Sequence, residues 1–174
     1  MKRLKILAKG SSEDNITATA DGGVLTVTAS SPEKNIVFPF VNTKIPNNDI
    51  EIYLPDNCPE SLEINSDYGD IDFISQPNTQ LVVNSSYGNV EASALYGSFD
   101  IHCDFGDIEI GKINISKSSS ITTDCGDIDV GYTHEIRVDG ETSRGSCDIK
   151  NNNPDSDIIL TVKTDLGDVE INDD

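Results

Sequence analysis

The stretch Cys103-Asp104-Phe105-Gly106-Asp107-Ile108-Glu109-Ile110 decides the fold, because the same pattern recurs along the chain. Its glycine has counterparts at nearly constant intervals, spaced 19, 18, 20, 19 and 22 residues apart. Such spacing marks an internal repeat in which each unit of about 20 residues is one supersecondary element. The corresponding glycines are Gly69, Gly88, Gly106, Gly126, Gly145 and Gly167.

Side chains alternate between apolar and acidic after each glycine. Apolar residues stand two and four positions after it and an acid stands between them, as in Ile108-Glu109-Ile110. This period of two is typical of a half-buried strand. A second alternating run, such as Leu62-Glu63-Ile64, precedes the glycine and is weaker in the fourth and fifth copies. The glycine therefore lies at a corner between two strand segments, where a positive φ favours this residue.

A unit of about 20 residues cannot bury its own apolar face, whereas stacked copies can. The repeat predicts an all-β fold, a single-stranded β-helix or β-solenoid of about six coils of ~19 residues each. We expect it to be right-handed, with strands about 4.8 Å apart. An antiparallel meander of hairpins and a β-sandwich are the alternatives.

Residues 1–60 lack the repeat, and residues 61–174 carry it. We interpret the first segment as a β cap or as irregular first coils, because a solenoid end exposes strand edges. Strands are predicted at residues 16–20, 24–28 and 50–55, with a turn at Asp21-Gly22-Gly23 and a loop-rich link at 31–48. The end of the chain after the sixth copy is predicted to be a poorly capped edge that Asp173 and Asp174 blunt.

The composition is strongly acidic, with 12 Lys and Arg against 31 Asp and Glu and a net charge of −19. Such a surface repels nucleic-acid phosphates and anionic lipid, so we expect neither as a partner. Cations, basic proteins and neutral polymers remain, and the charge can also act only to keep the protein soluble. No apolar run reaches the ~20 residues of a membrane span, and the run after Met1-Lys2-Arg3 is too short for a signal peptide.

Three pieces of the sequence occur in a characteristic order: residues 21–27 (DGGVLTV), residues 50–55 (IEIYLP) and the six glycine motifs. In this order the chain resembles a large bacterial domain family of unknown function described as adhesins. The resemblance covers most of the chain from about residue 15. It implies a single-stranded β-helix, usually in exported or membrane-anchored proteins, and therefore a location at the cell envelope. It supplies no catalytic residue.

Acidic side chains recur around the corner, one residue and three residues after the glycine and two residues before it. Stacking would align them into columns with ~5 Å between successive carboxylates, where repulsion is about 1 kcal/mol per pair in water. Hard oxygen ligands at a regular pitch suit Ca²⁺, and a solvated face that prevents aggregation is the alternative. The candidate calcium ligands are Asp70, Asp107, Asp127 and Asp168.

The position just before the glycine holds Tyr68, Tyr87 and Phe105 in the first three copies. These rings can form a packed corner ladder, which is the interpretation that we favour. They can instead form an exposed aromatic stack, a surface that grips sugars. The three residues are therefore the candidate binding surface.

The four cysteines are Cys58, Cys103, Cys125 and Cys147, and no pair has zinc-ligand spacing. We expect free and mostly buried thiols, with Cys147 at an inward position. No nucleophile, metalloprotease or phosphate-loop motif is present, which argues against an enzyme. The sequence favours a binding module that engages a protein or polysaccharide. The alternative is a structural or regulatory interaction domain, inside the cell, whose edge coils pair with partner proteins or with a second copy.

Overall fold

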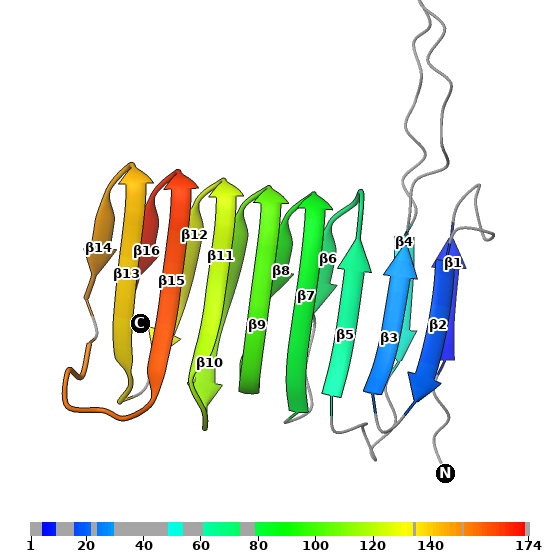
Figure 1. Ribbon diagram of the computed structural model, residues 1–174, viewed down its shortest axis with the longest axis horizontal. Coiled ribbons are helices and arrows are strands. Elements are labelled where there is room, and N and C mark those ends of the chain that lie inside the picture. Colours follow the sequence, from blue (N-terminus) through cyan, green and yellow to red (C-terminus); the bar gives the residue numbers. More distant parts are fainter. Residues whose placement is uncertain are drawn as a thin grey trace, which may run out of the picture.

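The structure is a computed structural model that describes residues 5–9, 16–21, 24–29, 49–53, 61–73, 79–133, 135–150 and 152–172. Within these residues it is built of strands and turns and contains no helix. Figure 1 shows the strands side by side in one elongated stack. The predicted all-β class is confirmed.

Six strand pairs follow the repeat, and each pair is joined at one of the glycine corners. The strand before each corner belongs to the set β5 (Ser61–Ser66), β7 (Thr79–Tyr87), β9 (Leu95–Phe105), β11 (Ser119–Cys125), β13 (Arg137–Arg144) and β15 (Ile159–Leu166). The strand after each corner belongs to the set β6 (Ile71–Phe73), β8 (Val90–Ala92), β10 (Ile108–Ile115), β12 (Ile128–Thr133), β14 (Cys147–Ile149) and β16 (Val169–Ile171).

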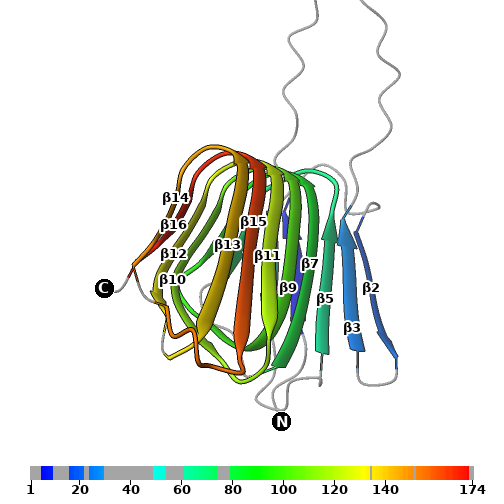
Figure 2. The ribbon, with the colours of Figure 1, turned by 60° about the vertical axis from the view of Figure 1, so that its left-hand side comes forward.

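Neighbouring pairs are parallel and in register, so equivalent repeat positions lie beside each other. Tyr87 is opposite Phe105 on one face, and Ile108 is opposite Ile128 on the other. Figure 2 shows the two faces wrapped around a shared interior. The fold is a parallel β-solenoid of about five turns, because six corners are separated by five intervals. The parallel pairing excludes a hairpin meander or an antiparallel sandwich for these strands.

The stack does not follow the order of the chain. β15 pairs with β11 on one side and with β13 on the other, and β16 lies between β12 and β14 in the same way. The sixth strand pair is therefore inserted between the fourth and the fifth. Figure 1 shows β15, coloured orange-red, between β11 and β13.

The fifth pair, β13–β14, consequently forms the end of the stack. Its inward positions include Gly140 and Cys147, which fill less space than the Val162 and Val169 of the sixth pair. Val162 and Val169 are fully buried, and Cys147 is exposed. The prediction that the C-terminal copy forms the edge is wrong, because the better-packed sixth pair takes the interior place. Asp173 and Asp174 lie outside the described residues.

Part of this edge is capped by the connection from β14 to β15. The Val138 N–H donates to Asn152 Oδ1 at 3.0 Å, and Asn152 Nδ2 donates to the Val138 carbonyl at 3.1 Å. The Asn153 N–H donates to the Ile136 carbonyl at 2.9 Å. An asparagine side chain thus replaces a neighbouring strand at the start of β13, which limits uncontrolled edge pairing.

The N-terminal part extends the stack in a different way. β2 (Ile16–Asp21) and β3 (Val24–Ala29) form an antiparallel hairpin, and β3 continues the sheet by parallel pairing with β5. β1 (Lys5–Lys9) and β4 (Asp49–Tyr53) form a separate two-stranded antiparallel sheet. The strands predicted at 16–20 and 24–28 are confirmed, and the one predicted at 50–55 is confirmed as far as Tyr53. Residues 54–55, the turn glycines and the link at 31–48 lie outside the described residues.

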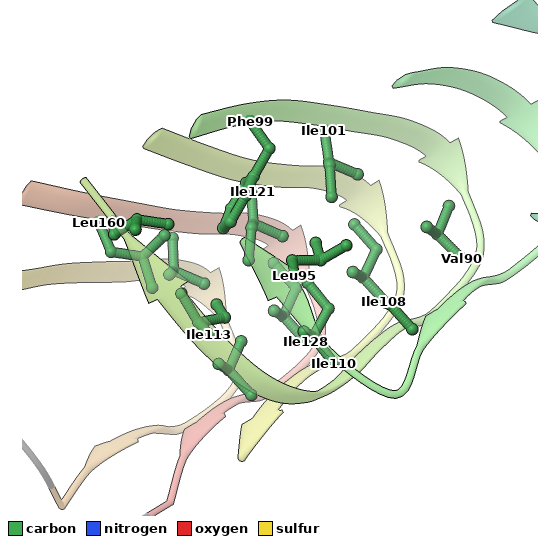
Figure 3. Packing of buried hydrophobic residues seen from close by; sticks show 14 of the residues in the cluster. Val90, Leu95, Phe99, Ile101, Ile108, Ile110, Ile113, Ile121, Ile128 and Leu160 are labelled. Atoms are coloured by element: carbon green, nitrogen blue, oxygen red, sulfur yellow. The ribbon is translucent and has the colours of Figure 1, made fainter. Parts of the chain in front are cut away.

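The inward positions of the repeat form one continuous core. Leu81, Ile101, Ile121 and Leu160 have no exposed surface, and they come from neighbouring strands of one face. Figure 3 shows Ile101, Ile121 and Leu160 on one side of this interior and Ile108, Ile110 and Ile128 on the other. Burying such a side chain contributes about 1.5–3 kcal/mol, so stacked aliphatic columns supply the driving force that one repeat cannot.

Candidate functional site

The glycine corners touch each other along the stack. A Cβ atom on Gly126 would lie 2.0 Å from the Gly106 carbonyl oxygen, and one on Gly167 would lie 2.0 Å from that of Gly126. Contacts this short require the backbone to shift. The positive φ of these residues, +156° and +150°, also disfavours any other side chain. Glycine is therefore required by the close approach of neighbouring corners as well as by the turn.

The aspartate after each glycine binds the backbone of the next corner. The Asp127 N–H donates to Asp107 Oδ1 at 2.8 Å, and the Asp168 N–H donates to Asp127 Oδ1 at 2.8 Å. Asn89 makes the same contact with its amide oxygen, which accepts the Asp107 N–H at 3.0 Å. This hydrogen-bonded column explains why an acid or amide stands here, and it offsets the repulsion between stacked carboxylates.

The column ends where the stack ends. Both the N–H and the Oγ of Ser146 donate to Asp168 Oδ1, at 2.7 and 3.0 Å. These bonds hold the pKa of the Asp168 carboxyl below its ordinary value, the backbone N–H being the larger cause. No further strand pair lies beyond Ser146 in the described structure, so the fifth copy needs no carboxylate at this position.

A second column, three residues before the glycine, secures the corner from inside. Thr123 and Thr164 donate their hydroxyls to the carbonyls of Gly106 and Gly126, at 3.1 and 3.0 Å. The thiol of Cys103 takes the same role toward Gly88. These hydrogen bonds hold one corner against the next, which makes the corners that carry them rigid.

The residue just before the glycine points outward. Tyr68 and Tyr87 stack with ring centroids 5.0 Å apart and planes 7° apart, and Tyr87 stacks on Phe105 at 5.0 Å and 5°. The three rings are 51%, 46% and 47% exposed. The favoured prediction of a packed corner ladder is wrong, because the corner turns this position away from the core. The alternative, an exposed aromatic stack, describes the structure.

The column continues beyond the rings. Cys125 is opposite Phe105, and Leu166 is opposite Cys125. Leu166 is 45% exposed, so four of the five exposed large apolar side chains of the described residues belong to this one column. We call the column the ridge, and its members are Tyr68, Tyr87, Phe105, Cys125 and Leu166. Cys125 and Leu166 directly precede Gly126 and Gly167, and the candidate binding surface predicted from the sequence did not include them.

Carboxylates border the ridge on both sides. An aspartate directly precedes four of its members and another follows two residues later, within about 7 Å along the backbone. The preceding acids are Asp67, Asp104, Asp124 and Asp165, and the following acids are Asp70, Asp107, Asp127 and Asp168. An exposed apolar strip is thus set between two acidic rows, an arrangement that attracts cationic and amphipathic groups.

A family model described as Toastrack DUF4097 matches residues 2–171. The chain belongs to the Toastrack family. The function of this family is unknown. The match confirms that the chain belongs to a domain family of unknown function, and the structure confirms the solenoid fold that the resemblance implied. Searches among curated proteins and among solved structures gave no match.

The acids of this Toastrack chain provide little for a metal ion in the described residues. No group of three or more His, Cys, Asp or Glu side chains converges there as a metal ion requires. Asp70, Asp107 and Asp127 use Oδ1 to accept the N–H of the neighbouring pair, and Asp168 binds Ser146. Backbone hydrogen bonding accounts for their placement, and calcium binding stays a prediction.

The polar face of the Toastrack solenoid pairs side chains across strands. His102 Nδ1 lies 2.9 Å from Thr122 Oγ1, and its Nε2 lies 3.1 Å from Asp104 Oδ1. Lys163 donates to Glu141 at 2.8 Å, which lowers the pKa of the Glu141 carboxyl and raises that of the Lys163 amine. Thr122 contacts His102 from the neighbouring strand, whereas Asp104 lies two residues from His102 on β9, and His102 and Asp104 are both partly exposed.

The cysteines of the Toastrack chain differ in burial. Cys103, Cys125 and Cys147 are free thiols, whereas Cys58 lies outside the described residues. Cys103 is buried as expected, and burial raises the pKa of its thiol. Cys147 is exposed, so the prediction of a buried thiol is wrong for it, because the end of the stack leaves its inward position uncovered.

The described residues contain no helix able to cross a membrane.

Proposed function

We propose that the protein is a non-catalytic binding module that engages a partner through the ridge. The observation that carries this proposal is the gathering of its exposed large apolar side chains in one column. Contiguous exposed apolar surface on a soluble domain commonly marks an interaction site. The adhesin-like role at the bacterial cell envelope, with a protein or polysaccharide ligand, is the context that we propose for it.

The ridge is suited to binding because its backbone is already ordered. The Asn89 N–H donates to Asp70 Oδ1 and the Asp107 N–H donates to Asn89 Oδ1, so the corners that carry the rings are held at the pitch of the stack before any partner arrives. Rigid aromatic anchors lose little conformational entropy on binding, which favours affinity. This rigidity supports a surface that recognises shape.

The orientation of the rings favours a protein partner over a polysaccharide. Carbohydrates stack on aromatic faces, but the faces of Tyr87 are covered by Tyr68 and Phe105 at 5.0 Å. The ring edges, the Tyr hydroxyls and the face of Phe105 that Tyr87 does not cover remain for contact, together with the two acidic rows. A polypeptide with apolar and basic side chains matches this surface in shape and charge.

A cross-linking experiment tests the proposed function. A photoreactive amino acid replaces Tyr87 or, as the control, Tyr96, which is an exposed tyrosine outside the ridge. Molecules of a bacterial envelope extract that are captured only at position 87 are purified, and a glycan array is examined in parallel. We expect binding of the purified partner to weaken at least tenfold in Tyr87→Ser/Phe105→Ser, on the order of a hot-spot loss. Tyr96→Ser should bind as the wild type does, and equal binding by all three proteins would remove the ridge from the function.

The open end of the stack supports a second candidate, a structural or regulatory domain that self-associates. Beyond the Asn152 cap, β13 pairs on one side only, with β15. Unpaired strand edges recruit other strands. Light scattering of the wild type and of a Thr142→Pro variant tests this idea, because proline removes a donor from the edge. A monomer in both cases over a wide concentration range contradicts self-association.

A further inference from the structure

The ridge has a gap at its fourth position. Phe105, Cys125 and Leu166 are successive partners across β9, β11 and β15, but Cys125 carries only a thiol where its neighbours carry large side chains. The ring stack therefore stops at Phe105, with one ring face turned toward Cys125. Cys125 is partly exposed, so the gap opens to solvent.

The size of the gap suits one planar group. Phe105 and Leu166 stand two strand spacings apart, about 9.6 Å at the usual separation of parallel strands. The rings of the ridge repeat every 5.0 Å. One flat group placed midway would continue the stack with the spacing that the rings already have.

The charge around the gap selects a cation. Asp124 precedes Cys125 directly, Asp127 follows it by two residues, and both are exposed. An aromatic face attracts a cation, and Arg stacks on it better than Lys because its guanidinium is planar. The chain itself places an arginine in this column, since Arg144 is the partner of Leu166 at the end of the stack.

We propose that the ridge binds an extended, arginine-bearing segment of a partner protein, with one guanidinium stacked on Phe105 above Cys125. This inference rests on the proposed function and specifies its partner. From Tyr68 to Leu166 the ridge spans four strand spacings, roughly 19 Å, which an extended chain covers with about six residues. Apolar side chains of that segment lie along the ring edges, and its basic side chains face the two acidic rows.

The probe is a synthetic peptide, Trp-Gly-Arg-Leu-Arg-Leu-Arg, whose fluorescence is specific because the protein contains no Trp. Matched peptides carry Lys or Glu in place of every Arg, and a cello-oligosaccharide represents a neutral sugar. We expect the Arg peptide to bind about two- to fivefold more tightly than the Lys peptide, the range of a surface cation–π contact. The Glu peptide and the sugar should not bind. Equal binding of the Arg and Lys peptides, or binding of the Glu peptide, would overturn the inference.

The matched variants are Cys125→Phe, which fills the gap, and Cys125→Ala, which keeps it. We expect Cys125→Phe to weaken binding of the Arg peptide about tenfold and Cys125→Ala to leave it unchanged. Asp67→Asn/Asp124→Asn beside the ridge should weaken it further than Glu91→Gln/Glu109→Gln, which removes the same charge from the other face. Equal effects of these two double variants would indicate nonspecific attraction and contradict the proposal.

A measurement on the wild type covers the case in which Cys125→Phe does not fold. The Arg peptide should slow alkylation of Cys125 by iodoacetamide at least fivefold, a protection expected of a stacked side chain, and leave Cys147 unaffected, as followed by peptide mass mapping. Unchanged alkylation of Cys125 overturns the inference. If the sugar binds instead and depends on Phe105, the proposed function stands and the arginine assignment fails. If, in addition, the Tyr87→Ser/Phe105→Ser variant binds the envelope partner as tightly as the wild type does, the proposed function and the arginine assignment both fail.

Discussion

The fifth and sixth strand pairs carry the same repeat but occupy different environments. β15–β16 is enclosed between two pairs, and its Leu160, Val162 and Ile171 are fully buried. β13–β14 has a neighbour on one side only, and its Cys147 is exposed. The enclosed pair keeps the carboxylate and the aliphatic columns, whereas the outer pair has Ser146 and Gly140 in their place.

This difference indicates that the place of a copy in the stack influences how closely it must keep the repeat pattern. An inner pair must satisfy hydrogen bonds and packing on both sides, and an outer pair on one side only. The fifth copy departs from both columns and forms the end, although it is not the last in the chain, whereas the fourth copy replaces one aliphatic residue by Ser119 and stays enclosed. The predictions below test this contrast.

We expect the largest effect from pairs of introduced cysteines, because each pair either forms a disulfide or does not. Ser120 and Thr161 are partners on β11 and β15, and Asp139 is the next partner of Thr161, on β13. We expect Ser120→Cys/Thr161→Cys to cross-link fully on mild oxidation, because adjacent strands are within reach of a disulfide. Ser120→Cys/Asp139→Cys spans two strands, about 9.6 Å, and should not cross-link. If non-reducing mass mapping showed the opposite result, the strand pairs would be stacked in the order of the chain.

An alanine at the glycine corner of the sixth pair should destabilise the protein more than an alanine at the corner of the fifth pair. A Cβ at position 167 would lie 2.0 Å from the Gly126 carbonyl oxygen, and one at 145 would lie 2.0 Å from that of Gly167. We expect Gly167→Ala to lower the free energy of unfolding by about 3–5 kcal/mol, because both sides of that pair are held. Gly145→Ala should cost only about 1–2 kcal/mol, since the outer pair can move outward. Urea unfolding measures both, and equal losses would contradict the contrast.

Thiol reactivity gives a smaller, kinetic contrast. In the native protein Cys147 should react with iodoacetamide at least tenfold faster than Cys103, because a buried thiol reacts only after local opening. Burial and the neighbouring Asp148 raise the pKa of the Cys147 thiol, which slows its reaction without protecting it. Mass mapping over time measures both sites. Protection of Cys147 equal to that of Cys103 would place the fifth pair inside the stack.

Acid should loosen the fifth pair slightly before the rest. Its contacts to the sixth pair lower the pKa of the Asp168 carboxyl, through Ser146, and that of the Glu141 carboxyl, through Lys163. A pKa lowered in the folded state adds stability above the unfolded value, near pH 4, and that stability is lost as pH falls through the folded value. The raised pKa of the Lys163 amine adds stability that is fully present below the unfolded pKa and is lost only as pH rises through the folded value, so it does not change the stability in acid. We expect amide exchange of β13, corrected for intrinsic rates, to rise below pH 4 more than that of β9, and identical profiles would contradict this.

The sequence predicts the solenoid because glycine spacing and period-two alternation are local and repeated. It does not predict the stack order, because every copy offers the same strand register to every other copy. Ser146 and Gly140 carry the missing signal, since they depart from two columns in one copy. The sequence also predicts the ridge only in part. Column counting aligns Tyr68, Tyr87 and Phe105, but the direction in which a corner turns decides whether they are packed or exposed.

The insertion of β15–β16 has a consequence for synthesis on the ribosome. The nascent chain emerges from its N-terminus, so the first four strand pairs can stack as they appear. The fifth pair then has no permanent neighbour until residues 159–171 have also been released. The strand pair translated after the fifth one therefore supplies the layer between the fourth pair and the fifth. This end of the stack closes only after β15–β16 has left the ribosome, although β13–β14, which forms the end, is translated earlier.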